Sequence, residues 1–323
     1  MTRRGRFNLL VTGLLLVAIG LDLFGGAHWF SPLSVISPGT SQAVLLGMRF
    51  PRTLCALMVG ALLAVGGLLL QTVSHNPIAD PSILGINAGA TLALVIGGVS
   101  GVALTVGHAA LLALIGAGLA YVIVLLLAVA GTGVDPLRLL LGGTVFSGFI
   151  SCLTYAISVV TNTTQAFRNL LIGGFSGVDY GQVSLLAVAT VIVVGLTWLN
   201  RASFTLMALD HETFKGLGAS LPVLWGLTTI VIMVAAASSV AVAGNIGFVG
   251  LGVPQLVNAI IPGSFKQNLG PTLLTGAGFM TLADFCVKGF VAGTELPLAA
   301  LSAIIGGVAL FGLVAFGQKV IRL

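Results

Sequence analysis

Long apolar runs separated by short polar segments fill almost the whole chain. A helix needs about 20 apolar residues to cross a bilayer, and runs of roughly that length recur throughout the sequence. We therefore expect an all-α polytopic membrane protein, built as one transmembrane domain over residues 1–323, with about ten spanning helices. The predicted spans are 7–24, 53–72, 89–107, 109–130, 139–160, 183–199, 221–242, 246–261, 271–291 and 298–316.

Composition supports the membrane assignment. The chain is 57% hydrophobic and only 7% charged, whereas soluble domains carry about 25% charged residues. Its 45 glycines are typical of spanning helices that approach one another closely. The net charge of +5 comes without a basic cluster interleaved with aromatic residues, so membrane lipid is an expected partner and nucleic acid is not.

The stretch 49–90 is more specific than an ordinary apolar helix. It opens with Arg49-Phe50-Pro51-Arg52, continues as an apolar run and stops at a polar turn. Pro77 and Pro81 lack an N–H group and disfavour helix in the residue before them. The spanning helix is expected to end near His75, and the next helix to begin only after Pro81. The residues of this elbow are Asn76, Pro77, Asp80, Pro81 and Gly85.

Basic residues predict the orientation, because cytoplasmic loops retain Lys and Arg. With the N-terminus inside and about ten spans, both termini are cytoplasmic and most of the 13 Lys and Arg lie on that side. The cytoplasmic set is Arg3, Arg4, Arg6, Arg138, Arg201, Lys215, Lys266, Lys319 and Arg322. The outside set is Arg49, Arg52, Arg168 and Lys288.

The few charges near the outer side allow two interpretations. Arg49 and Arg52 can anchor to lipid headgroups or bind a partner. Asp284 precedes Lys288 by four residues, which favours an ion pair along a helix, although an intramembrane carboxylate can also relay ions. Asp22, near the end of the first span, is expected at the membrane interface.

The sequence lacks the motifs of catalysis. It contains no G-x-x-x-x-G-K-[ST] loop for phosphates and no G-x-S-x-G nucleophile motif. The four histidines are scattered, and the three cysteines form no C-x-x-C pair. We expect no catalytic residues, no cofactor and no resident metal, so the chain itself is not expected to be an enzyme.

Several motifs together resemble one permease family. These are R-x-P-R at 49–52, G-A-L-L-A-V-G-G at 60–67, N-P-I-A-D-P-S-I-L-G-I-N-A-G-A at 76–90, and G-x-I-x-F-x-G-L-x-x-P at 244–254. They are similar to the membrane subunits of ABC importers for iron–siderophore, haem and vitamin B12 (FecCD/BtuC-like). The resemblance covers roughly residues 49–316.

The resemblance implies the type II importer permease fold and an ATP-driven function. The cargo would be an iron(III) chelate carried across the bacterial cytoplasmic membrane, with a ferric siderophore first and haem or cobalamin next. It also implies three partners: a second permease copy or paralogue, ATP-binding subunits, and a periplasmic or lipoprotein substrate-binding protein. The elbow would then lie at the gate.

The resemblance also assigns roles to particular residues. Arg49, Arg52 and Lys288 would dock the substrate-binding protein, although Lys288 replaces an Arg and loses its planar fork. In the loop after residue 200, apolar side chains at helical spacing would insert into a groove on the ATPase. The coupling residues are Leu206, Leu209, Phe214, Leu217 and Gly218. Gln255 and Asn258 stand where the family has His and Arg.

Two other functional classes remain to be compared with this hypothesis. An ion-coupled secondary transporter of a small metal chelate would suit interrupted helices, with Asp284 as its coupling site. A membrane-embedded enzyme is disfavoured by the missing motifs. An adjacent ATPase with a phosphate-binding loop, encoded beside a binding protein, would favour the ABC importer.

Overall fold

The structure is a computed structural model that describes residues 2–26, 28–36, 39–130, 133–134, 136–208, 221–289 and 296–316. Helices form nearly all of its regular structure, as expected. Within the described ranges the strands are β1 (Val129–Ala130) and β2 (Gly133–Val134), which pair antiparallel in a short turn between two helices.

Within the described ranges, seven helices have 20 residues or more. They are α1 (Arg3–Phe24), α3 (Phe50–Ser74), α5 (Val106–Ala128), α6 (Pro136–Val160), α8 (Tyr180–Leu199), α11 (Leu221–Ala243) and α13 (Phe265–Gly289). Shorter helices are α2 (Thr40–Val44), α4 (Ile86–Val99), α7 (Thr164–Ile172), α9 (Arg201–Leu206), α12 (Val249–Ile260) and α14 (Leu298–Phe316). Short 3₁₀ or π turns are η1 (Pro32–Val35), η2 (Leu45–Arg49) and η3 (Pro81–Leu84).

Every predicted span overlaps one of these helices, but not all are long. Among the described residues, six helices are long and apolar enough to cross a membrane alone. The predicted third and eighth spans are the shorter helices α4 and α12, because polar segments before them enter the bundle. The number of crossings and the sides of the termini stay predictions.

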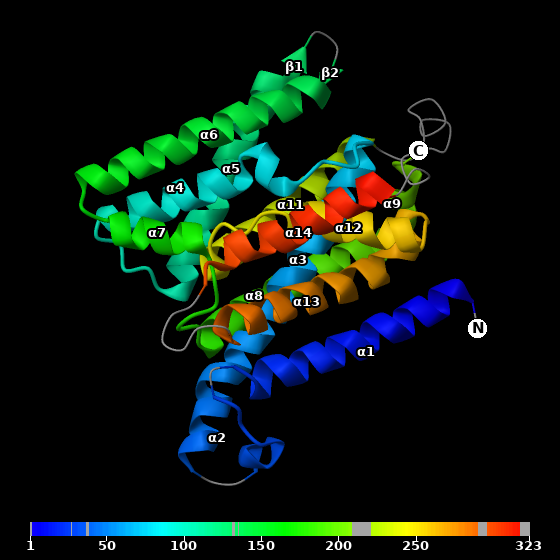
Figure 1. Ribbon diagram of the computed structural model, residues 1–323. Coiled ribbons are helices and arrows are strands. Elements are labelled where there is room, and N and C mark those ends of the chain that lie inside the picture. Colours follow the sequence, from blue (N-terminus) through cyan, green and yellow to red (C-terminus); the bar gives the residue numbers. More distant parts are fainter. Residues whose placement is uncertain are drawn as a thin grey trace.

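The helices form one bundle around α3 (Figure 1). Helix α3 packs against α8, α11, α12 and α13, and 83% of the residues in its most apolar 18-residue stretch are buried. A helix surrounded by others is apolar on all sides, as its sequence is. Helix α1 lies along one edge against α13, and only 17% of the residues in its most apolar 18-residue stretch are buried. Helix α6 lies along the opposite edge.

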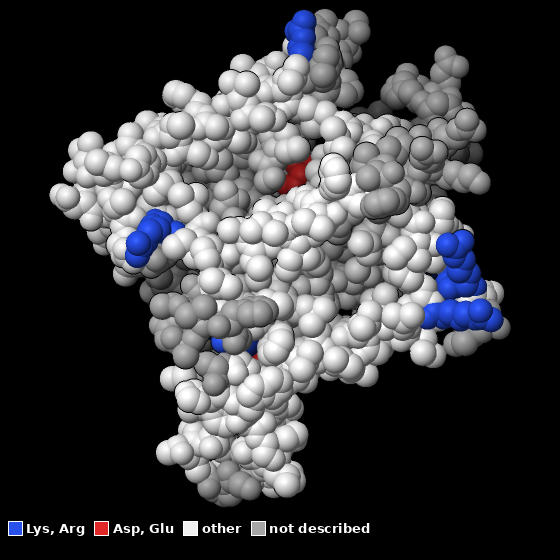
Figure 2. Space-filling view, in the orientation of Figure 1, with Lys and Arg blue, Asp and Glu red and all other residues white. Residues whose placement is uncertain are grey.

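The bundle has two ends. We call the end where α1 begins and α3 ends the proximal end, and the end where α1 ends and α3 begins the distal end. Figure 2 shows that the surface between the ends is almost free of charged side chains. That surface suits lipid, whose hydrocarbon core leaves a charge unsolvated.

Glycines let the backbones cross in direct contact at the centre of the bundle. A Cβ on Gly67 of α3 would overlap the backbone of Gly250 in α12, and one on Gly60 would overlap the backbone of Gly276 in α13. Small residues at such crossings replace side-chain packing by backbone packing. The position of α3 among its neighbours therefore depends on these glycines.

We expect Gly67→Ala to destabilise the fold by about 1–3 kcal/mol, because the added methyl overpacks a backbone contact. The measurement is thermal unfolding of the purified chain in detergent. Gly13→Ala in α1 is the matched control, since a Cβ there meets nothing within 4 Å. Equal melting temperatures for the two variants would show that the crossing can relax without cost.

Candidate functional site

The predicted elbow is present where the sequence placed it. Helix α3 ends at Ser74, and His75 follows in the left-handed region with φ 51°. Turn η3 begins at Pro81, and α4 begins at Ile86. Both predicted boundaries, an end near His75 and a restart after Pro81, are confirmed.

Local hydrogen bonds shape the elbow itself. Asn76 Oδ1 accepts a bond from the N–H of Ile78 at 3.0 Å, and Asp80 Oδ1 accepts one from the N–H of Ser82 at 2.7 Å. Gly85 has φ +78°, and a Cβ there would lie 3.1 Å from the Phe146 ring. Backbone conformation and space thus both favour glycine at this position.

The elbow enters the bundle instead of turning outside it. Gly250, the second residue of α12, crosses Gly67 seven residues before α3 ends, so α12 begins roughly 10 Å inside the proximal end. Gly89, near the start of α4, meets Gly116 in the middle of α5. The N-termini of α4 and α12 therefore both lie within the bundle.

Two glutamine side chains tie the elbow to α12. Gln71 Nε2 lies 3.3 Å from the carbonyl oxygen of Ala79 and 3.2 Å from those of Gly250 and Leu251. Gln255 Nε2 donates to Gln71 Oε1 and to the carbonyl oxygen of Pro77, each at 2.9 Å. The elbow and α12 are therefore held together by amide hydrogen bonds.

Asp80 completes this polar region. Its side chain is buried, and its Oδ2 faces the first turn of α12 beside Gly250. The N-terminus of a helix carries partial positive charge, which stabilises a nearby carboxylate. Asp80 therefore connects η3, where it caps the turn, to α12.

The break between α11 and α12 is held by backbone and side-chain contacts. The N–H of Asn245 donates to the carbonyl oxygen of Leu170 at 2.9 Å, and Asn87 Nδ2 donates to Asn245 Oδ1 at 2.9 Å. Phe248 has φ 76°, an unfavourable conformation for an aromatic residue and one that is found at functional sites. Its ring lies against Gly252 and Gly306.

Sequence reasoning did not assign roles to Gln71, Gln255 and Asn258. Asn258 Oδ1 accepts bonds from the N–H of Gly263 and from Asn268 Nδ2, and so closes the end of α12. The position of Gln71, an amide within an apolar span, was a signal that could have predicted a buried polar contact. The partner of that amide, on a helix 184 residues later, could not be read from the sequence.

The charges at the distal end form one connected cluster. Arg52 holds Asp284 with two bonds of 2.8 Å, from Nε to Oδ2 and from Nη2 to Oδ1. Lys288 Nζ lies 2.7 Å from Asp22 Oδ1 and 3.3 Å from Asp284 Oδ2. Thr53 donates to Asp22 Oδ2 at 2.6 Å. We call Asp22, Arg52, Asp284 and Lys288 the distal charge cluster.

The cluster confirms one expectation and adds a contact to another. Asp22, near the end of α1, has a fully buried side chain, because Lys288 from α13 and Thr53 from α3 both reach it. The predicted pair of Asp284 with Lys288 is present. A cluster of two acids and two bases is neutral as a whole and joins α1, α3 and α13.

Arg49 lies beside the cluster but binds backbone. Its guanidinium donates to the carbonyl oxygens of Leu23, Gly25 and His28 at 3.1, 2.8 and 2.7 Å. It also lies 4.6 Å from the centre of the Phe30 ring. A cation at the C-terminus of α1 satisfies carbonyls that lack helical partners.

Of the predicted coupling residues, Leu206 is described. It ends α9 and packs partly buried against the core, next to Phe204, whose ring lies 5.5 Å from that of Phe265. The others, Leu209, Phe214, Leu217 and Gly218, lie outside the described residues.

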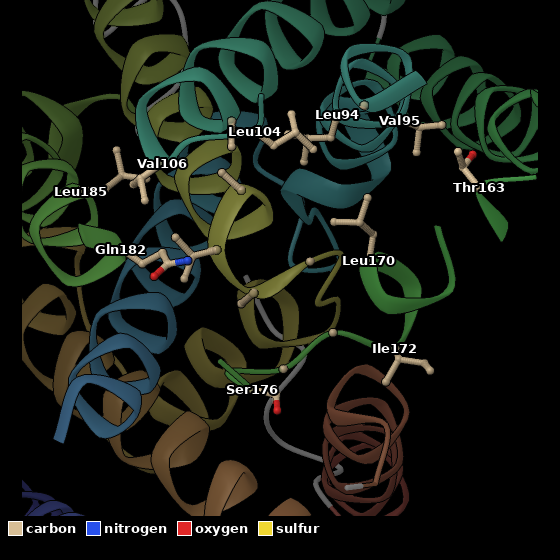
Figure 3. A pocket seen from close by; sticks show the side chains of 18 of the residues that line it. Leu94, Val95, Leu104, Val106, Thr163, Leu170, Ile172, Ser176, Gln182 and Leu185 are labelled. Atoms are coloured by element: carbon tan, nitrogen blue, oxygen red, sulfur yellow. The ribbon is translucent and has the colours of Figure 1, made fainter. Parts of the chain in front are cut away.

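A cavity of about 710 Å³ opens between α4, α5, α7, α8 and α11. Figure 3 shows its mostly apolar lining, including Leu94, Leu104 and Leu170, with the amide of Gln182 at one side. None of the described residues that line it is charged. In the part of the chain that the structure describes, no three His, Cys, Asp or Glu side chains gather as a metal site.

We expect Lys288→Ala to lower the stability of the isolated chain by about 3–5 kcal/mol, because it leaves Asp22 buried without its cation. Lys288→Met combined with Asp22→Asn should recover much of that loss, since the charge is removed from both sides. The measurement is the melting temperature in detergent without any partner protein. Arg168→Ala, at an exposed cation, is the control. An unchanged melting temperature for Lys288→Ala would show that the cluster does not stabilise the fold.

We expect Gln255→Leu to loosen the elbow, because two hydrogen bonds of about 0.5–1.5 kcal/mol each are lost. Amide hydrogen exchange over residues 76–85 should accelerate by roughly two- to tenfold or more. Thr72→Val is the control, since the Thr72 hydroxyl bonds only within its own helix, to Leu68. Equal exchange in the two variants would mean that the elbow holds its shape without α12.

Comparison with known proteins places these features in a family. The model of the FecCD transport family matches residues 14–316. The Fe(3+)-citrate import system permease protein YfmD of Bacillus subtilis is 33% identical, over 89% of this chain and 88% of that protein. The vitamin B12 import system permease protein BtuC of Klebsiella pneumoniae is 32% identical, over 94% of this chain and 91% of that protein.

Solved structures agree with the sequence relatives. An inward-facing metal-chelate-type ABC transporter matches with a TM-score of 0.84 and 26% identity, over 97% of this chain and 100% of that one. PsaBC of Streptococcus pneumoniae, at a TM-score of 0.62 and 11% identity, shares the fold. Since the family model spans nearly the whole chain, the chain belongs to the FecCD transport family and is a multi-pass membrane permease of the ABC importer type.

Proposed function

We propose that this chain is the permease subunit of a binding-protein-dependent ABC importer that carries an iron(III) chelate across the bacterial cytoplasmic membrane. The main support for this proposal is the family match over residues 14–316. Relatives named for ferric citrate, ferric hydroxamate and vitamin B12 import add to it. A ferric siderophore is the first choice, and haem or cobalamin follows. All are metal ions wrapped in organic ligands, so the path needs no metal-binding side chains.

The energy source is proposed to lie on separate ATP-binding subunits. The sequence has no phosphate-binding loop, so this chain would transmit a conformational change and not make one by hydrolysis. The loop after α9, with Leu206, Leu209, Phe214, Leu217 and Gly218, is the proposed contact. Phe204 and Met207 anchor the base of that loop in the core.

The gate is proposed to lie at the elbow. Because Gln71 and Gln255 join the elbow to α12, a movement of α12 would carry the elbow with it. Helices that begin inside a membrane are found at transport pathways, and α4 and α12 both do so. The strained Phe248 at the start of α12 suits a hinge of this kind.

A second permease copy, or a paralogue, is proposed to pack against the α6 and α14 side. Large apolar side chains are exposed on both helices. Examples are Val145 and Phe149 on α6, and Val308 and Phe311 on α14. The chelate would pass between the two copies, past apolar surfaces of this type. With about ten crossings, the elbow would lie on the cytoplasmic side.

The substrate-binding protein is proposed to dock at the distal end through Arg49, Arg52 and Lys288. All three already bind internal acceptors. A partner carboxylate would therefore share these cations with the protein instead of meeting free charges, and the side chains of Arg52 and Lys288 are each only 11% exposed. The distal charge cluster itself holds helices together with or without a partner.

The ion-coupled alternative is weaker. Asp284, its proposed coupling site, is held at two points by Arg52, and the relatives are ABC permeases.

The test is uptake by the full complex in proteoliposomes. With the ATP-binding subunits and the binding protein present, we expect ATP-dependent accumulation of labelled ferric hydroxamate, ferric citrate or cyanocobalamin. The chain purified alone should hydrolyse no ATP. Uptake by the chain alone, driven by a proton or sodium gradient, would overturn the proposal in favour of the secondary transporter.

A further inference from the structure

Residues 28–36 and 39–48 form a lobe beside the distal end of the bundle, which we call the distal lobe. It contains η1, α2 and η2, and the sequence from Gly25 to Met48 holds no Asp, Glu, Lys or Arg. In Figure 1, α2 lies below the bundle, on the side of α1, where it continues through η2 into α3. In Figure 2 this projection carries no charged side chain.

The distal lobe exposes large apolar side chains. Trp29 is 67% exposed, Leu33 70%, Ile36 78% and Met48 68%. An uncharged apolar surface of this kind is unfavourable in water and marks contact with a protein or a membrane.

The distal lobe is nevertheless fixed to the bundle. Arg49 closes its base through the three carbonyl contacts described above. The Tyr180 hydroxyl, at the start of α8, donates to the carbonyl oxygen of Leu46 at 2.6 Å. Within the lobe, Gln42 Nε2 donates to the carbonyl oxygen of Val35 at 2.8 Å. Its apolar side chains are therefore held in a set position relative to the spanning helices.

We propose that the distal lobe is a membrane-surface anchor, which lies in the interfacial layer of the bilayer with Trp29, Leu33, Ile36 and Met48 against lipid. An uncharged apolar surface at the end of a lipid-facing helix suits this layer. Tryptophan is enriched at this depth.

The position of the distal lobe next to α1 favours lipid over a protein as the partner of its apolar surface. Helix α1 is the least buried of the long apolar helices and exposes Leu14, Leu16 and Val17, so its outer face is a lipid face. The distal lobe extends from that face, on the opposite edge of the bundle from α6. A protein partner that recognises charge would find none on the lobe.

The experiment is spin-label accessibility in lipid vesicles. The full chain carries Cys55→Ala, Cys152→Ala and Cys286→Ala, plus one labelled cysteine at Ile36→Cys. Collisions with oxygen, which concentrates in lipid, are compared with collisions with a water-soluble nickel chelate. Leu14→Cys on α1 is the lipid reference, and Ser100→Cys, exposed in the turn after α4, is the distal comparison.

We expect the Ile36→Cys label to shift toward the Leu14→Cys reference, with oxygen favoured over nickel. Nickel accessibility equal to that of Ser100→Cys would overturn the proposal, because the lobe would then stand in water. Spin–spin broadening at Ile36→Cys would overturn it in favour of a second copy. Loss of nickel accessibility only when a binding protein is added would overturn it in favour of docking.

A second probe covers the case in which the cysteine-free chain does not fold. The chain has three tryptophans, and Trp198→Phe with Trp225→Phe leaves Trp29 alone. Brominated lipid should quench its fluorescence and iodide should not. The reverse pattern would also overturn the proposal. Neither probe depends on transport, so both can fail while the proposed function stands.

Discussion

The structure depends on one constraint: backbone N–H and C=O groups that lie away from water must find partners inside the protein. Helices α4 and α12 both begin within the bundle, so the segments before them carry unpaired backbone groups at that depth. The side-chain amides of Gln71 and Gln255 donate to two carbonyls of the elbow and to two in the first turn of α12, and Gln255 also donates to Gln71. Asn245 joins the helix break to α7 and α4. Irregular backbone is tolerated here because side-chain amides replace water.

Much of the fold could be predicted from the sequence, because hydropathy and proline act locally. Apolar runs gave the helices, and Pro77 and Pro81 gave the elbow with its boundaries. The lengths of α4 and α12 could not be predicted, since an apolar run has the same pattern whether its helix starts at the membrane surface or inside the bundle. The sequence also contained the glycines of α3, but not which backbones they would meet.

The candidate sites were predictable to a smaller extent. Asp284 and Lys288 are four residues apart on one helix, and their pair was expected and is present. The partner of Asp22 could not be predicted, because its cation lies on α13, far away in the sequence. Arg49 and Arg52 were expected to anchor to lipid headgroups or to bind a partner protein, and their internal partners from other elements were not predicted. Long-range pairing of this type leaves no local signal.

The distal charge cluster has a consequence for how the chain is made. Arg52 and its partner Asp284 are separated by 232 residues. Gly67 and Gly250, whose backbones meet in the bundle, are also far apart in the sequence. Helices enter the bilayer in the order of their synthesis. Until α13 is made, Asp22 and Arg52 lack their ion-pair partners, and Gly60 of α3 lacks its contact with Gly276. The bundle is therefore completed late in synthesis, when α12 and α13, in the last quarter of the chain, pack against α3. A nascent chain stopped before α13 would hold Arg52 without Asp284 and Asp22 without Lys288.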